Sequence, residues 1–155
     1  MSKVSIVKSD SYDEIKEVIA KSVDFLGGFD QFVKKGDKVL LKPNVVRYIR
    51  NYPTVTEPEF VAASAELVSE QTDASEVIVA DSPTLTRTAR MAFTETGYRD
   101  LFDEKGIKVR YLDEDIFIKV SAPGSRVYRE MMIPKSIIDC DCLINLPKLK
   151  THIQA

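Results

Sequence analysis

Residues 38–44, Lys-Val-Leu-Leu-Lys-Pro-Asn, decide how we interpret this chain. The apolar run Val39-Leu40-Leu41 lacks the alternation of a strand with one wet face, and it suits a parallel strand covered on both faces. Pro43 fixes its own backbone angle and biases Lys42 toward an extended conformation. The stretch therefore predicts a short buried strand that ends in a rigid polar corner.

Strand and helix signals alternate on both sides of this stretch. Further strands are expected over residues 4–7, 75–80, 107–112 and 142–146, and helices over residues 11–26, 56–68, 88–95, 98–104 and 134–138. Residues 116–120 and 128–133, split by Ala-Pro-Gly-Ser, indicate a β-hairpin insertion. This order predicts an α/β fold, a three-layer sandwich with a mostly parallel sheet and helices on both faces.

Two helix starts carry specific signals. Ser11-Tyr12-Asp13-Glu14 has the form of a capping box, in which the serine and the glutamate satisfy free backbone N–H groups. Thr56 precedes Pro58 and Glu59, which predicts an N-cap threonine with proline in the first turn.

Composition sets the class of protein. The chain has 155 residues, 22 Lys and Arg against 24 Asp and Glu, one His and two Cys. We expect a single α/β domain over residues 3–152. A net charge of −2 without a basic block argues against nucleic acid as a partner, and no apolar run is long enough to span a membrane. Without an apolar leader segment, the expected location is the cytoplasm.

The two cysteines, Cys140 and Cys142, stand one residue apart. Neighbouring strand positions point apart, so a disulfide between them is not expected. They are expected at a helix–strand junction with at least one thiol buried. Together with the single histidine they do not form a zinc site of known spacing.

Three of the expected strands end in polar residues. In open parallel α/β sheets, ligands bind outside the carboxyl ends of the strands. Lys42 and Asn44 follow one strand, and Asp81 and Ser82 follow another. The last strand leads into Asn145-Leu146-Pro147-Lys148-Leu149-Lys150-Thr151-His152, which is rich in groups that bind anions or exchange protons. We therefore expect one cleft at this edge of the sheet.

Within that cleft each residue type has an expected role. An anionic substrate or cofactor would be held by basic, amide and hydroxyl side chains, namely Lys42, Asn44, Ser82, Asn145, Lys148 and Lys150. Asp81 would act as a base or coordinate a metal, and His152 would transfer a proton. Simpler interpretations stay open: a solvated Lys42, helix capping by Ser82, Thr84 or Thr86, and a frayed C-terminal tail.

Four motifs carry a resemblance over nearly the whole chain. In order they are Lys42-Pro43-Asn44, Thr54 with Thr56-x-Pro58-Glu59, Asp81-Ser82-Pro83, and residues 145–152. They resemble the domain-of-unknown-function 362 family of bacteria and archaea, whose most specific element is the closing Asn-x-Pro-Lys-x-Lys-Thr-His motif. The resemblance implies a cytoplasmic, redox-associated α/β protein, often fused to ferredoxin-like iron–sulfur modules.

The chain departs from the family pattern at two places. Glu57 stands where the family commonly has histidine, and the chain stops before the Gly-containing segment that usually follows the Lys-Thr-His motif. We therefore expect the N-terminal part of a longer family domain. The cofactor is open, because no ferredoxin cysteine cluster is present and an iron–sulfur cluster would have to lie outside this chain.

Three functional interpretations follow. The first is the α/β part of a redox-associated enzyme that binds an anionic small molecule or cofactor in the cleft. The second is a non-catalytic module that docks an iron–sulfur partner or a ferredoxin-like domain. The third is a structural fragment that pairs with a C-terminal half. Nucleophile elbows, Walker loops and Gly-x-Gly-x-x-Gly loops are absent from the sequence.

Overall fold

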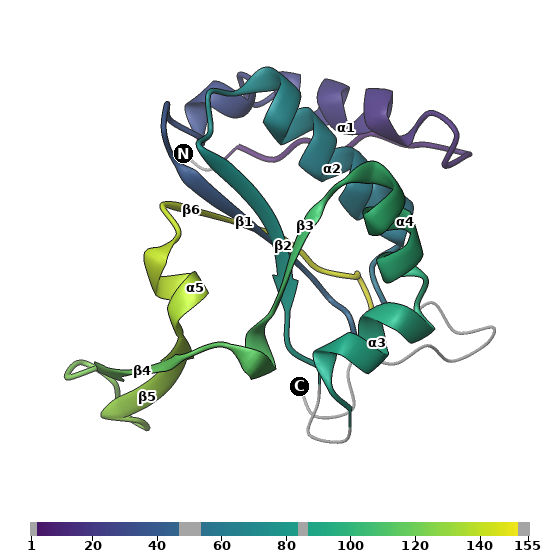
Figure 1. Ribbon diagram of the computed structural model, residues 1–155. Coiled ribbons are helices and arrows are strands. Elements are labelled where there is room, and N and C mark those ends of the chain that lie inside the picture. Colours follow the sequence, from purple (N-terminus) through teal and green to yellow (C-terminus); the bar gives the residue numbers. More distant parts are fainter. Residues whose placement is uncertain (1–2, 47–53, 84–86, 152–155) are drawn as a thin grey trace.

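The sheet of this protein has four parallel strands in the order β3-β2-β1-β6 (Figure 1). The computed structural model describes residues 3–46, 54–83 and 87–151. The strands are β1 (Lys38–Pro43), β2 (Glu76–Asp81), β3 (Lys108–Tyr111) and β6 (Cys142–Leu146). A separate antiparallel hairpin joins β4 (Phe117–Ser121) to β5 (Glu130–Pro134). The predicted parallel sheet with a hairpin insertion is confirmed.

Helices lie on both faces of this sheet, as predicted, but unequally. The helices are α1 (Ile15–Asp24), α2 (Pro58–Gln71), α3 (Ala89–Glu95), α4 (Tyr98–Lys105) and α5 (Lys135–Asp139), with short 3-10 turns at Phe29–Gln31 and Leu112–Glu114. Helices α1 to α4 lie on one face of the sheet and α5 lies on the other (Figure 1). Side chains of α1 to α4 pack on the first face, and Ile137 of α5 packs on the second.

Strand β1 lies inside the sheet and is covered on both sides. Val39 and Leu41 point toward α1 to α4, while Leu40 points toward α5, and none of the three is more than 1% exposed. This burial explains why the strand is apolar at consecutive positions rather than at alternate ones.

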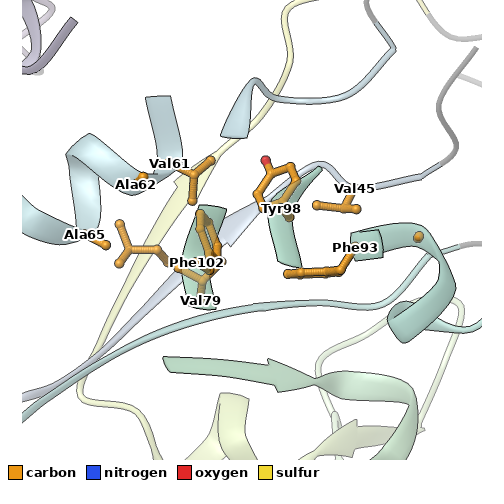
Figure 2. Close-up of a cluster of buried hydrophobic side chains, with 10 residues drawn as sticks. Val45, Val61, Ala62, Ala65, Val79, Phe93, Tyr98 and Phe102 are labelled. Atoms are coloured by element: carbon orange, nitrogen blue, oxygen red, sulfur yellow. The ribbon is translucent and has the colours of Figure 1, made fainter. Parts of the chain in front are cut away.

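Aromatic rings fill the core between the sheet and the helices (Figure 2). Phe93 of α3 lies 5.2 Å from Tyr98 and 5.5 Å from Tyr111, measured between ring centroids, and Tyr98 lies 5.1 Å from Phe102. The tilted and edge-on angles are those that aromatic pairs prefer. These contacts fix α3 and α4 against the ends of β2 and β3.

The predicted strand over residues 4–7 is wrong. Residues 3–9 form no strand, and Val4 and Ile6 are 82% and 88% exposed. The place beside β1 is occupied by β6, which pairs with β1 from Val39 to Pro43. Residues 3–9 instead run beside α1, where Ser22 Oγ donates to Ser5 Oγ at 3.2 Å.

Both predicted helix caps are also wrong. Helix α1 begins at Ile15 with no side-chain cap, because the Ser11 hydroxyl bonds to Asp13 within a local turn. Helix α2 likewise has Glu57 at its N-cap and no side-chain cap, since the Thr56 hydroxyl bonds elsewhere. Of the helices in the described ranges, α3 shows a side-chain cap, where Thr88 accepts from the Met91 N–H.

Glu66 of α2 joins three helices through two lysines. Its carboxylate lies 2.6 Å from Lys105 Nζ of α4 and 3.1 Å from Lys16 Nζ of α1. The bond from Lys105 lowers the pKa of Glu66, burial opposes that change, and Lys16 adds to the lowering. A lowered folded pKa means that the stabilisation is complete above the ordinary carboxyl pKa and is lost as the pH falls through the folded value.

Replacing Glu66 by glutamine is therefore expected to lower the free energy of unfolding by about 0.5–1 kcal/mol at neutral pH, as for other partly exposed ion pairs. Urea unfolding at a series of pH values measures this loss of free energy. The difference in free energy of unfolding between Glu66→Gln and the wild type should disappear in acid. Glu104→Gln, on the exposed side of α4, is the control. A Glu66→Gln loss that persists unchanged in acid would contradict the electrostatic cause.

Candidate functional site

Thr56 connects the carboxyl ends of β1 and β6. Its hydroxyl accepts from the Asn44 N–H at 3.0 Å and donates to the Leu146 carbonyl at 2.7 Å. Its backbone N–H donates to the Asn44 carbonyl, and its own carbonyl accepts from the Tyr98 hydroxyl at 2.7 Å. Only 4% of Thr56 is exposed, so each of these bonds replaces one to water. The two strand ends are thus held at a fixed separation.

Asp81, at the end of β2, is a buried carboxylate beside a lysine of β1. Its Oδ1 lies 2.6 Å from Lys42 Nζ, and its Oδ2 accepts from the Val45 N–H at 2.7 Å. Only 3% of Asp81 is exposed, whereas the Lys42 side chain is 37% exposed. The approach of Lys42 to Oδ1 is close but lacks hydrogen-bond geometry, so within the described residues Oδ1 accepts no regular hydrogen bond. Lys42 and Asp81 therefore form a close ion pair at this oxygen.

Burial raises the pKa of Asp81, and the Lys42 ammonium and the Val45 N–H oppose that change. A carboxyl with a raised folded pKa stabilises the fold in its protonated form, and this contribution is lost as the pH rises through the folded value. Above the folded value the ionised group therefore costs stability. Such costs gather at functional sites, where a group must exchange a proton near working pH.

A second ion pair lies where β6 ends. Lys148 Nζ is 3.1 Å from Glu57 Oε1, and its side chain is 22% exposed. Glu57 follows Thr56 directly, so this pair sits next to the bonds that join β1 to β6. The position that commonly holds histidine in the resembled family thus carries the counter-charge of a site lysine.

The structure brings several of the predicted site residues to one edge. Lys42 pairs with Asn145 across β1 and β6 and contacts Asp81 of β2. Lys148 lies past the end of β6 beside Glu57. Strand spacing of about 4.8 Å puts the three strand ends within reach of one small ligand.

Other predicted residues stand in different situations. The Asn44 side-chain N–H donates to the Thr54 carbonyl at 2.8 Å, so that group is used within the fold. Ser82 and Lys150 are exposed. His152 lies outside the described residues, so its proton-transfer role stays a prediction. Thr84 and Thr86 lie outside them too, but the N-cap of α3 is Thr88, so the alternative of helix capping by Ser82, Thr84 or Thr86 is wrong.

The cysteines lie at the helix–strand junction, as predicted. Both are free, and their side chains take opposite sides: Cys140 packs near Leu40, and Cys142 near the α1–α2 side of the core. Both thiols are partly buried, and burial raises the pKa of each. In the part of the chain that the structure describes, no three His, Cys, Asp or Glu side chains gather as metal ligands.

Strand order marks the same edge independently. From β1 the chain proceeds to β2 and β3 on one side, whereas β6 lies on the other side of β1. The order therefore reverses between β1 and β6, and ligands of open α/β sheets bind outside the carboxyl ends at such a point. Lys42 and Asn145 flank this reversal in register.

These features define an open parallel α/β protein with charged side chains at its topological switch point. Sequence comparison identifies the family: the chain belongs to the family described as "Domain of unknown function (DUF362)", whose model matches residues 39–155. The chain is also similar to the thylakoid-associated protein sll1697 of Synechocystis sp., with 34% identity over 154 residues.

That alignment covers 97% of this chain and 46% of the relative, so the chain spans about half the length of the curated relative that it matches. No solved structure matches the chain. Across the described residues, none of the helices is long and apolar enough to cross a membrane.

Proposed function

We propose that this chain binds a small anionic molecule or cofactor at the carboxyl edge of β1, β2 and β6, as the α/β part of a redox-associated protein. The observation that carries the proposal is the pair of Lys42 with buried Asp81 at the point where the strand order reverses. The redox association rests on family resemblance.

The exposure of the two partners supports an exchangeable pair rather than a structural one. Lys42 keeps over a third of its side chain in contact with solvent, so a ligand can reach its ammonium group. An anion that takes Lys42 as its partner leaves Asp81 with the Val45 N–H, and the raised pKa of Asp81 allows the carboxyl to take up a proton. Binding would then be coupled to proton uptake at Asp81.

Lys148 provides a second positive charge at the same edge. It is held by Glu57, which an arriving anion would have to displace. Lys150 lies nearby in sequence and is exposed. Asn145, in register with Lys42, is placed to orient the ligand through its side-chain amide.

The experiment is a calorimetric titration with inorganic pyrophosphate. Replacing Lys42 by alanine is expected to weaken binding about tenfold, because one charge-assisted contact to the anion is lost. Lys119→Ala, on the exposed hairpin, is the matched control and should bind as the wild type does. Equal affinity of the wild type and Lys42→Ala would show that the anion does not bind at this edge.

A second candidate is a docking module without chemistry, because both site lysines are already paired with carboxylates. Its partner would be a ferredoxin-like domain or protein. Such a module needs no carboxyl that exchanges a proton, so a substitution of Asp81 distinguishes the two candidate functions.

Asp81→Asn is expected to tighten pyrophosphate binding about threefold or more, because Lys42 loses its competing counter-charge while Asn still accepts from Val45. Calorimetry measures this, with exposed Asp100→Asn as the control. Weaker binding would mean that Asp81 is needed to hold Lys42 in place. Tighter binding with loss of cellular function supports the enzyme, and tighter binding with full function supports the docking module.

The cytoplasmic location is part of the proposal. The relative's name associates that protein with thylakoids. Fractionation of cells that express the tagged chain tests the cytoplasmic location of this chain. Recovery of the chain in the membrane fraction would contradict that location.

A further inference from the structure

A cavity of about 320 Å³, partly open to solvent, lies between α1, α2 and the strands β1 and β6. Its walls include Ile19 of α1, Val68 of α2, Leu41 of β1, and Ile144 and Leu146 of β6. An engineered apolar cavity of roughly 150 Å³ already binds benzene or xenon.

The polar side-chain groups that line this cavity are already hydrogen-bonded. They are three serine hydroxyls: Ser9 donates to the Ser11 carbonyl, Ser22 to Ser5, and Ser64 to the Phe60 carbonyl of its own helix. The other lining side chains are apolar. Water needs two to four polar partners, so an apolar guest suits this space better than water does.

Leu146 connects the lining of the cavity to the charged edge of the sheet. Leu146 lines the cavity, and its carbonyl accepts from Thr56. Lys148 follows two residues later, so the two Cα atoms lie within about 7 Å. A molecule with an apolar chain and an anionic head thus meets matching chemistry at both ends.

We infer that this cavity binds the aliphatic chain of an amphipathic anion whose head sits at Lys148. The position of the head rests on the proposed anion site, whereas the position of the chain does not. Medium-chain carboxylates are the simplest molecules of this class.

The test uses n-decanoate, uncharged 1-decanol and inorganic pyrophosphate as probes in calorimetric titrations. Ser64→Leu fills the cavity and removes only a bond within α2. This variant is expected to bind decanoate and decanol about tenfold more weakly than the wild type does, and to bind pyrophosphate with unchanged affinity. Ser69→Leu is the matched control, because Ser69 makes the same kind of bond on the exposed side of α2. Lys148→Ala should weaken the binding of decanoate and leave the binding of decanol unchanged.

A second measurement needs no variant. Methyl NMR of the wild type should show contacts from the decanoate chain to Ile19, Val68 and Ile144. Absence of these contacts at saturation, or equal binding by Ser64→Leu, would overturn the inference. Concentration-dependent protection of these methyls without ligand would show that a second copy fills the cavity, which also overturns it. Decanol binding with no pyrophosphate binding would leave the chain site standing and remove the proposed anion site.

Discussion

Replacing Phe93 by alanine is expected to lower the free energy of unfolding by about 3–5 kcal/mol, the usual cost of removing a buried ring. Phe93 has no exposed surface, and it contacts the rings of Tyr98 and Tyr111. Its loss opens a cavity between α3 and the end of β2, where the remaining rings cannot close in without giving up their own contacts. Urea unfolding followed by circular dichroism measures the change.

The matched control for this prediction is Phe117→Ala. Phe117 begins the hairpin strand β4 and is 44% exposed, so its removal should change the free energy of unfolding far less. Similar losses for the two variants would mean that the ring cluster in Figure 2 is not the main core.

Replacing Thr56 by valine is expected to lower the free energy of unfolding by about 2–4 kcal/mol, since two backbone groups lose their partner at once. Valine has nearly the same shape but leaves the Asn44 N–H and the Leu146 carbonyl unpaired in a region closed to water. The loss should be accompanied by weaker pyrophosphate binding, because the ends of β1 and β6 are no longer held together.

Thr94→Val is the control for this change. Thr94 is exposed on α3, and its hydroxyl bonds only to the Arg90 carbonyl of the same helix, which keeps its own helical bond. If Thr56→Val lowers the free energy of unfolding no more than Thr94→Val does, the hydroxyl of Thr56 does not hold the strand ends together.

Local sequence predicted the elements whose signals need no distant partner. The strand β6 was expected over residues 142–146 and is found there, because its apolar run is bounded by polar and proline residues. The helices α3 and α4 were expected over residues 88–95 and 98–104, and Gly97 lies between them in a left-handed conformation. Burial of β1 on both faces followed from its unbroken apolar run.

Features that depend on distant partners were missed. Residues 4–7 have strand-forming side chains, but β6 takes the place beside β1. The hydroxyl of Thr56 resembles a helix cap in sequence, yet its partner is a carbonyl 90 residues away. No local signal indicates which carboxylates pair with Lys42 and Lys148, since Asp81 and Glu57 reach them only through the parallel sheet and its connections.

The candidate site was predicted in its location rather than in its chemistry. Placing Lys42, Asp81 and Asn145 at one edge followed from the rule that parallel strands end together. Sequence did not indicate that both site lysines are held by carboxylates, with which the proposed anion would have to compete.

The central claim is that a small anion binds at the carboxyl edge of β1, β2 and β6. Backbone amide NMR during a titration with inorganic pyrophosphate tests it most directly. The account predicts saturable shifts at Val45, Ser82, Asn145 and Lys148, which lie at the three strand ends. Shifts confined to other surfaces, such as the lysines near the end of α4, or no saturable shifts at all, would contradict it.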